Sequence, residues 1–222
     1  MIFDVFSGNA DFLTLMIKLF SRLFVIFCTM PIHEYAHAFI ATKLGDQTPR
    51  LAGRLTLNPM AHISPIGALM IILCGFGYAK PVSVNPRNFK DSKKGMALTA
   101  IAGPIANLIM GFIFVFVSLS FGELKPTMIT SAFYTFFYFA AVVNINLAVF
   151  NLLPIPPLDG SRILQLLIPA KYYYKFLEYE RYIVIVVFIL ILTGVLTTPL
   201  SIISSVIINL FTKIASLPFG LF

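Results

Sequence analysis

Long apolar runs are the feature that most constrains how this chain can fold. Residues 23–44, 95–121 and 131–153 each reach the roughly 20 apolar residues that a helix needs to cross the hydrocarbon core of a bilayer. A backbone in lipid must satisfy its own hydrogen bonds, and a helix does so. With 59% hydrophobic and 11% charged residues, the chain leaves no room for a separate soluble domain. We therefore predict an all-α polytopic membrane protein in which residues 1–222 form a single domain.

The rest of the chain brings the predicted helical bundle to about five to six membrane segments. Residues 182–196 and 200–217 are apolar, and the interruption between them allows either one bent span or two. Residues 66–79 are apolar but short, and basic residues flank them on both sides. Because basic loops tend to stay on one side of the membrane, we interpret this segment as a re-entrant hairpin or a short tilted helix.

Two short segments next to residues 66–79 have the alternating hydrophobicity of β-strands. They are residues 53–59 and 80–86, and each ends at an Asn-Pro turn. Together they predict a small β-hairpin region whose edge can pair with an extended peptide, with Val82 and Val84 as candidate substrate-binding residues. Ordinary loops fit the same residues equally well.

One apolar segment carries the pattern His-Glu-x-x-His, formed by His33, Glu34 and His37. Residues four apart lie on the same face of a helix, so the two imidazoles can bind one metal ion, for which zinc is the natural candidate. Glu34 lies beside that face and can act as a general base toward water. Ionisable side chains at membrane depth are costly and normally mark a site. The segment therefore predicts a buried site for one Zn²⁺ per chain. Pro31 just before it predicts a kink, which either turns the ligands inward or is merely tolerated.

Asp159 is the candidate third ligand. It lies in residues 151–162, where three prolines and a glycine forbid a continuous helix. A catalytic zinc takes three protein ligands and keeps a fourth position open, so two histidines and a carboxylate complete the set. The alternative is that Asp159 only caps a short helix running to Ile168.

The remaining polar residues of the apolar segments admit structural and functional interpretations. His62, in a loop, can hydrogen-bond a substrate, although a lone loop histidine is more often structural. Asn107 lies in a stretch of small residues, which predicts a hydrogen bond across a helix interface. Asn144 and Asn151 share one helix face, which predicts that they point toward the interior of the bundle.

The net charge of +7 comes from Lys and Arg residues that lie mostly between the apolar runs. In a membrane protein such residues determine topology and contact lipid headgroups, so the lipid bilayer is the predicted partner and nucleic acid is not.

These residues resemble the site-2 protease family, the intramembrane zinc metalloproteases. The resemblance covers nearly the whole chain and rests on His-Glu-Tyr-Ala-His at 33–37, Leu-Asn-Pro-Met-Ala-His at 57–62, Ala-Lys-Pro-Val at 79–82, Ala-Gly-Pro-Ile-Ala-Asn at 102–107 and Asn-Leu-Leu-Pro-Ile-Pro-Pro-Leu-Asp-Gly at 151–160. The chain is similar to the short form of the family, without the PDZ domain or the cystathionine-synthase-type domain of other branches.

The resemblance implies a role for each residue of the candidate site. His33, His37 and Asp159 match the zinc ligands, Glu34 matches the catalytic base, and Asn151 matches an asparagine that stabilises the oxyanion. The implied function is a zinc endopeptidase that cleaves transmembrane segments of other membrane proteins near the cytoplasmic side. The compact build and the lack of a recognisable targeting peptide favour a prokaryotic inner membrane over an organelle.

Two other functions compete with this interpretation. A metal transporter also places His and Asp inside a bundle, but it is expected to bind metal at several sites along a pathway. A non-proteolytic zinc-binding scaffold would tolerate the loss of Glu34, which is present here. Neither the individual substrate nor the oligomeric state follows from these residues.

Overall fold

The computed structural model describes residues 12–74 and 79–220, and within them the chain is helical and contains no β-strand. Four stretches are long and apolar enough to cross a membrane: Phe12–Lys43, Ser92–Gly122, Met128–Asn151 and Thr197–Phe219. The predicted all-α membrane class is therefore confirmed. The predicted number of five to six membrane segments is not, because the described residues provide four such helices.

The first membrane helix carries the His-Glu-x-x-His motif and is continuous. It consists of α2 (Phe12–Phe24), the π-helical turn η1 (Val25–Thr29) and α3 (Met30–Lys43). Pro31 has no N–H to donate, and its ring crowds the carbonyl one turn earlier, so the helix widens there. The N–H of Met30 donates to the carbonyl of Val25, five residues back. Pro31 therefore widens the turn just before His33 without ending the helix.

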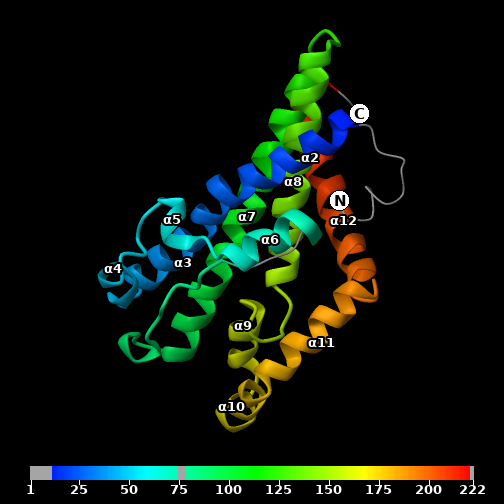
Figure 1. Cartoon of the computed structure of the whole chain (residues 1–222). Coiled ribbons are helices and arrows are strands. Elements are labelled where there is room, and N and C mark those ends of the chain that lie inside the picture. The colour runs from blue at the N-terminus through cyan, green and yellow to red at the C-terminus, as the bar shows by residue number, and fades with distance from the viewer. Residues whose placement is uncertain (1–11, 75–78, 221–222) are drawn as a thin grey trace.

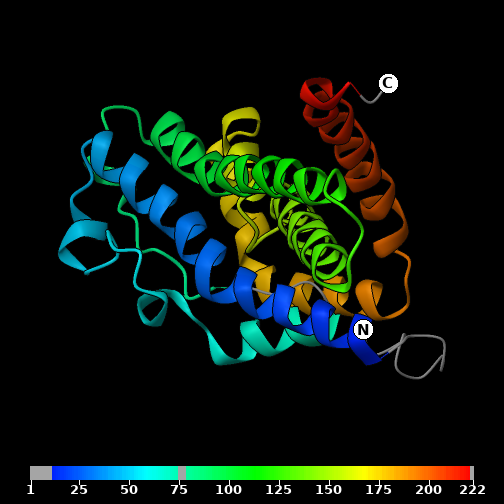
Figure 2. The same ribbon diagram turned by 90° about the horizontal axis from the view of Figure 1, so that it is seen from above.

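Helices α7 (Ser92–Gly122) and α8 (Met128–Asn151) form the central pair of the bundle. Helix α3 packs against α7, α2 packs against α8, and α12 (Thr197–Ser216) packs against both members of the pair. Seen from above, α2 and α3 lie on one side of the pair and α12 lies near its other end (Figure 2). This packing places the motif-bearing face of α3 against α7.

Aromatic and aliphatic side chains hold α2, α7 and α8 together. The ring of Phe24 on α2 lies 5.5 Å from that of Phe114 on α7 and 5.4 Å from that of Phe136 on α8. Val25 and Ile26 are almost fully buried in the same core. Lipid tails are as apolar as these side chains, so the contacts stabilise the bundle by close van der Waals packing and not by removal of surface from water. The resulting core fixes the start of α3 relative to α7.

The shorter elements lie mainly at one end of the bundle (Figure 1). They are α4 (Thr48–Leu51), α5 (Pro59–His62), α6 (Pro65–Cys74), η2 (Pro86–Asn88), α9 (Gly160–Leu167), α10 (Ala170–Glu178), α11 (Glu180–Leu192) and η3 (Leu217–Phe219). Of these, α6 lies beside α2, and the guanidinium of Arg22 donates to the carbonyl of Ile72. The predicted re-entrant segment at 66–79 falls partly on residues 75–78, outside the described residues, and its described part is mainly helix α6.

The two predicted strands, 53–59 and 80–86, are not strands. Residues 53–58 form turns and irregular chain, and residues 79–85 have no regular secondary structure. Prolines at 59, 81 and 86 remove donors that a β-ladder requires. One backbone hydrogen bond does join this region, from the N–H of Lys80 to the carbonyl of His62 at 2.7 Å. The loop interpretation therefore describes these residues better than the β-hairpin.

Candidate metal centre

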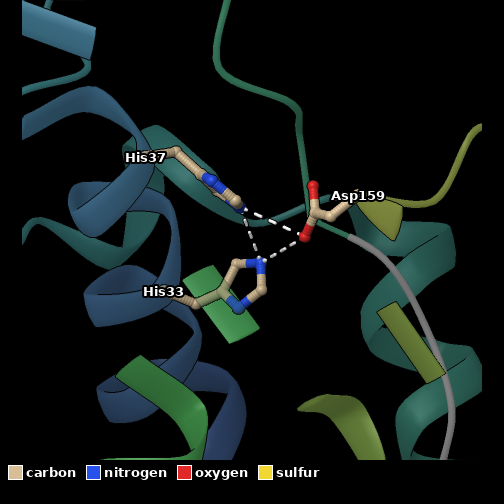
Figure 3. Close-up of side chains that lie close together, drawn as sticks. All are labelled: His33, His37 and Asp159. Atoms are coloured by element: carbon tan, nitrogen blue, oxygen red, sulfur yellow. Dashed lines mark hydrogen bonds and ion pairs between the residues drawn. The ribbon is translucent and has the colours of Figure 1, made fainter. Parts of the chain in front are cut away.

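Three side chains from two distant parts of the chain converge at one point. His33 and His37 lie one turn apart on α3, and Asp159 directly precedes α9 (Figure 3). The two Nε2 atoms lie 3.0 Å apart, and Oδ2 of Asp159 lies 3.4 Å from Nε2 of His33 and 3.3 Å from Nε2 of His37. Among the described residues this is the one group of three or more His, Cys, Asp or Glu side chains with such spacing.

The donor atoms of this group fit a zinc ion. In a tetrahedral zinc site the ligand atoms lie about 2.0–2.1 Å from the ion, which separates them from one another by about 3.3–3.4 Å. The separations of 3.0, 3.3 and 3.4 Å are close to that value. Oδ2 of Asp159 is buried and accepts no hydrogen bond from a described residue, as expected of an atom reserved for a metal.

The tautomer of His37 follows from its neighbour on α7. Nδ1 of His37 lies 2.7 Å from the carbonyl oxygen of Thr99, which can only accept, so Nδ1 carries the proton and donates. Nε2 then has a free lone pair directed at the other two donors. A backbone carbonyl that orients a metal-binding histidine in this way is a common feature of zinc sites.

Gly103 on α7 makes room for both histidines. A Cβ at this position would lie 2.3 Å from Nε2 of His37 and 2.6 Å from Nε2 of His33, far inside van der Waals contact. Any side chain there would occupy the space in which the donor atoms meet. The sequence offered Gly103 only as one of several small residues, and its contact with the histidines follows from the packing of α7 on α3.

The chain turns sharply after α8 to bring Asp159 to the histidines. A Cβ at Gly160 would lie 2.2 Å from the carbonyl oxygen of Leu152, so only glycine permits this close turn. Asp159 occupies the N-cap position of α9, but its side chain makes no capping hydrogen bond. Its carboxylate is directed at His33 and His37 instead (Figure 3).

Glu34 lies beside the three donor atoms without joining them. The residue is 6% exposed, and Oε1 lies 4.0 Å from Nε2 of His33. The carboxylate is therefore near enough to exchange a proton with a molecule held at the centre, directly or after a small movement.

The centre opens into a cavity of about 600 Å³. Its lining includes Met30, His33, Glu34 and His37 from α3, Pro81, Val82, Val84 and Pro86 from the segment before α7, Thr99, Ala100 and Asn107 from α7, and Asn151, Asp159 and Arg162 from the region between α8 and α9. The same cavity thus contains the candidate metal ligands and Val82, Val84 and Asn151, which the sequence proposed for substrate contact.

His62 is not brought to this cavity. Its ring is fully buried, and its Nε2 lies 2.8 Å from the carbonyl oxygen of Thr56. The backbone carbonyl of His62 also accepts a hydrogen bond from the N–H of Lys80. These two hydrogen bonds place His62 among the residues that hold the surrounding loops. The geometry agrees with the structural interpretation of this residue.

Asn107 lines the cavity, which the sequence did not suggest. It is 2% exposed, and no hydrogen bond joins its side chain to another helix among the described residues. The predicted bond across a helix interface is therefore absent. The sequence could have indicated this position of Asn107, because Asn107 lies one turn after Gly103 and therefore on the α7 face that packs against the histidines.

Comparison with known sequences gives a consistent result. Residues 122–194 match the sequence model of peptidase family M50, a span that includes Asp159. YwhC of Bacillus subtilis (strain 168) is 42% identical over 164 residues, covering 72% of this chain and 75% of YwhC. MJ0611 of Methanocaldococcus jannaschii is 41% identical over 133 residues, 60% of this chain and 63% of that protein. Rip2 of Mycolicibacterium smegmatis is 29% identical over 134 residues, 58% of this chain and 50% of Rip2. All three names contain the words zinc metalloprotease, and no solved structure matches the chain.

Proposed function

Because this chain belongs to peptidase family M50, and is therefore a zinc metalloendopeptidase of the membrane, we propose that it cleaves the transmembrane segments of other proteins within the bilayer. The observation that carries the proposal is the position of the centre. His33, Glu34 and His37 all lie inside the apolar stretch Phe12–Lys43. His37 precedes the end of that stretch by roughly 9 Å at the rise of an α-helix, so the chemistry takes place below the membrane surface.

The proposed roles of the residues follow from their donor atoms. His33, His37 and Asp159 hold the zinc ion, which, when bound, polarises the scissile carbonyl and lowers the pKa of the attacking water. Glu34 accepts the proton that this water loses and donates it to the nitrogen of the departing amine, so the net reaction is addition of water across the peptide bond. The side-chain amide of Asn151 donates a hydrogen bond to the carbonyl oxygen as negative charge develops on it.

A helical substrate must unwind before its peptide bond reaches the centre, because its carbonyls are otherwise bonded within the helix. Residues 81–84 are suited to hold the unwound part. Val82 and Val84 line the cavity, and the N–H groups of residues 82, 83 and 84 donate to no acceptor within the described part of the chain. In extended chain alternate N–H groups point the same way, so an extended peptide can pair with those of residues 82 and 84 by main-chain hydrogen bonds, even though the segment is not a strand in isolation.

The distribution of charge supports a cytoplasmic position for the centre, in a prokaryotic inner membrane. The positive-inside rule places basic loops in the cytoplasm. Twelve of the sixteen Lys and Arg residues belong to segments 43–54, 80–94 and 162–181. These segments surround the end of the bundle at which α3 ends and α7 and α9 begin, away from the connection between α7 and α8 (Figure 1).

Metal transport and a purely structural role receive less support from the same observations. Transport requires further ligand groups along a path, whereas residues 12–74 and 79–220 contain one such group. A scaffold has no use for a buried carboxylate beside the ligands, yet Glu34 is in place.

Glu34→Gln tests the proposal directly. The substitution removes the base and preserves the three ligands, so we expect about one zinc per chain and a rate of cleavage lower by about 10²–10⁴-fold. Purified protein in detergent is assayed for metal content and for cleavage of single-span substrates, with and without chelator. Glu123→Gln, at the exposed connection after α7, is the matched control. Near-normal cleavage by the Glu34 variant at equal zinc content would disprove the mechanism.

A further inference from the structure

Asp46 is a fully buried carboxylate in the loop that follows α3. It accepts four hydrogen bonds. Two are local, from the backbone N–H of Thr48 at 3.0 Å and from its hydroxyl at 2.6 Å. The other two cross to a distant segment, from the backbone N–H of Asn85 at 2.7 Å and from the side-chain amide of Asn88 at 2.6 Å. The zinc-binding helix is thereby joined to the chain just before α7.

The segment that Asp46 holds is the one that lines the cavity opposite α3. It is fixed at two ends, by the N–H of Lys80 bonded to the carbonyl of His62 and by the N–H of Asn85 bonded to Asp46. Between these points the N–H groups of residues 82–84 make no hydrogen bond within the described chain. The position of this free edge is therefore determined by its two attachments and by the packing of Val84 against the cluster of Ala41, Phe89 and Met96.

The bonds to Asp46 are strong because the acceptor is charged. Burial by itself would raise the pKa of the Asp46 carboxyl, but the hydrogen bonds from Thr48, Asn85 and Asn88 outweigh it and lower the pKa below its ordinary value. The group is accordingly ionised at neutral pH, and charge-assisted hydrogen bonds are about twice as strong as neutral ones. A packed apolar cluster of Ala41, Phe89 and Met96 lies next to the same junction.

We propose that Asp46 is a positioning residue for substrate: it sets the separation between the zinc-binding helix α3 and the edge formed by residues 81–84, and so the width of the space in which an unwound peptide is held. This inference rests on the function proposed above. It concerns substrate binding and not zinc binding, because Asp46 lies beyond the end of α3, outside the ligand group.

Asp46→Asn distinguishes the two carboxylate oxygens. Oδ1 receives the bonds from Thr48 and Asn88, whereas Oδ2 receives the bond from the N–H of Asn85. An asparagine can keep its carbonyl oxygen at the first position only by directing its own NH₂ group at the N–H of Asn85, donor against donor. The variant thus breaks the attachment of the edge specifically. Asn88 is exposed, and Asn88→Ala removes the hydrogen bond that its side-chain amide donates to Asp46 while Asp46 itself is unchanged.

The measurement is kcat and KM for one single-span substrate, together with zinc content. We expect Asp46→Asn to raise KM by about tenfold, from loss of a bond to a charged acceptor, and Asn88→Ala to raise it less, with zinc content unchanged in both. Asp91→Ala is the matched control, because Asp91 also accepts a backbone hydrogen bond, from Lys94 as the N-cap of α7, but receives none from residues 85 or 88. Its KM should stay at the wild-type value.

A second measurement keeps binding separate from chemistry. In the Glu34→Gln background with the native cysteines replaced by serine, Val84→Cys is expected to form a disulfide, on addition of a mild oxidant, with cysteines placed along the substrate segment, and Asp46→Asn should reduce the yield of that cross-link. An unchanged KM and an unchanged cross-link in both variants would overturn the role of Asp46. Absence of cleavage by the wild-type protein would instead refute the proposed function, so the two failures are distinguishable.

Discussion

Asp159 joins two parts of the chain that are far apart in sequence, and its proposed role as a ligand depends on one charged oxygen. Asp159→Asn preserves the size of the side chain and its ability to cap α9, but it removes the anionic oxygen that lies 3.3 Å from His37. Because two histidines alone do not complete a catalytic zinc site, we expect both Asp159→Asn and Asp159→Ala to lose zinc and activity. Metal analysis of the purified variants measures the effect.

The helix-cap alternative makes a different prediction for the same variants. If Asp159 only capped α9, Asn would behave like the parent, and Ala would lower the free energy of unfolding by about 1 kcal/mol. Full zinc occupancy and full cleavage in Asp159→Asn would therefore exclude Asp159 from the centre.

Gly103 provides a second test at a single residue. We expect Gly103→Ala to lose most of its bound zinc, because the added methyl group would lie 2.3 Å from Nε2 of His37 and displace the donors. Gly111→Ala is a suitable control on the same helix. Its Cβ would meet the side chain of Ile145 at 2.8 Å, which predicts a loss of stability of about 1–3 kcal/mol by overpacking, with zinc retained. Equal zinc content in the two variants would contradict this account of Gly103.

At the scale of elements, residues 81–84 before α7 are proposed to hold substrate through backbone N–H groups more than through side chains. Val82→Pro and Val84→Pro each remove one N–H that makes no hydrogen bond within the described chain. If these groups bond to the substrate, both variants should cleave more slowly, by about tenfold for each lost bond, with normal metal content.

Ser83→Pro is the control for these two variants. In extended chain successive N–H groups point in opposite directions, so the N–H of residue 83 should point away from a substrate that pairs with residues 82 and 84. We expect its rate to be close to that of the parent. If all three proline variants cleaved at the parent's rate, residues 81–84 would be only a wall of the cavity.

At the scale of the whole molecule, the uneven distribution of charge predicts the orientation in the membrane. Lys90 and Lys125 are both exposed and lie at opposite ends of α7. With the native cysteines replaced by serine, Lys90→Cys should react with an impermeant thiol reagent only in inside-out vesicles, and Lys125→Cys only in right-side-out ones. The opposite pattern would place the zinc-bearing end outside the cytoplasm.

The sequence by itself determined the class of this protein and two of the three candidate metal ligands, because both depend on local patterns. The length of the apolar runs requires membrane helices, and the spacing of His33 and His37 places both on one face of whichever helix carries them. The same residues made Glu34 the candidate base and Asp159 the candidate third ligand, and the family resemblance added Asn151; these roles stay predictions until the variants are measured.

Only the tertiary structure decided which distant groups meet. The carboxylate of Asp159 approaches the histidines because α8 and α9 pack against α7, and Gly103 contacts them because α7 packs against α3. The prediction of two β-strands was wrong. Alternating hydrophobicity shows that a segment can be extended, but not that it has a neighbouring strand with which to form hydrogen bonds. Asp46 carried no signal in the sequence, because its importance lies in hydrogen bonds to residues 85 and 88, which only folding brings within reach.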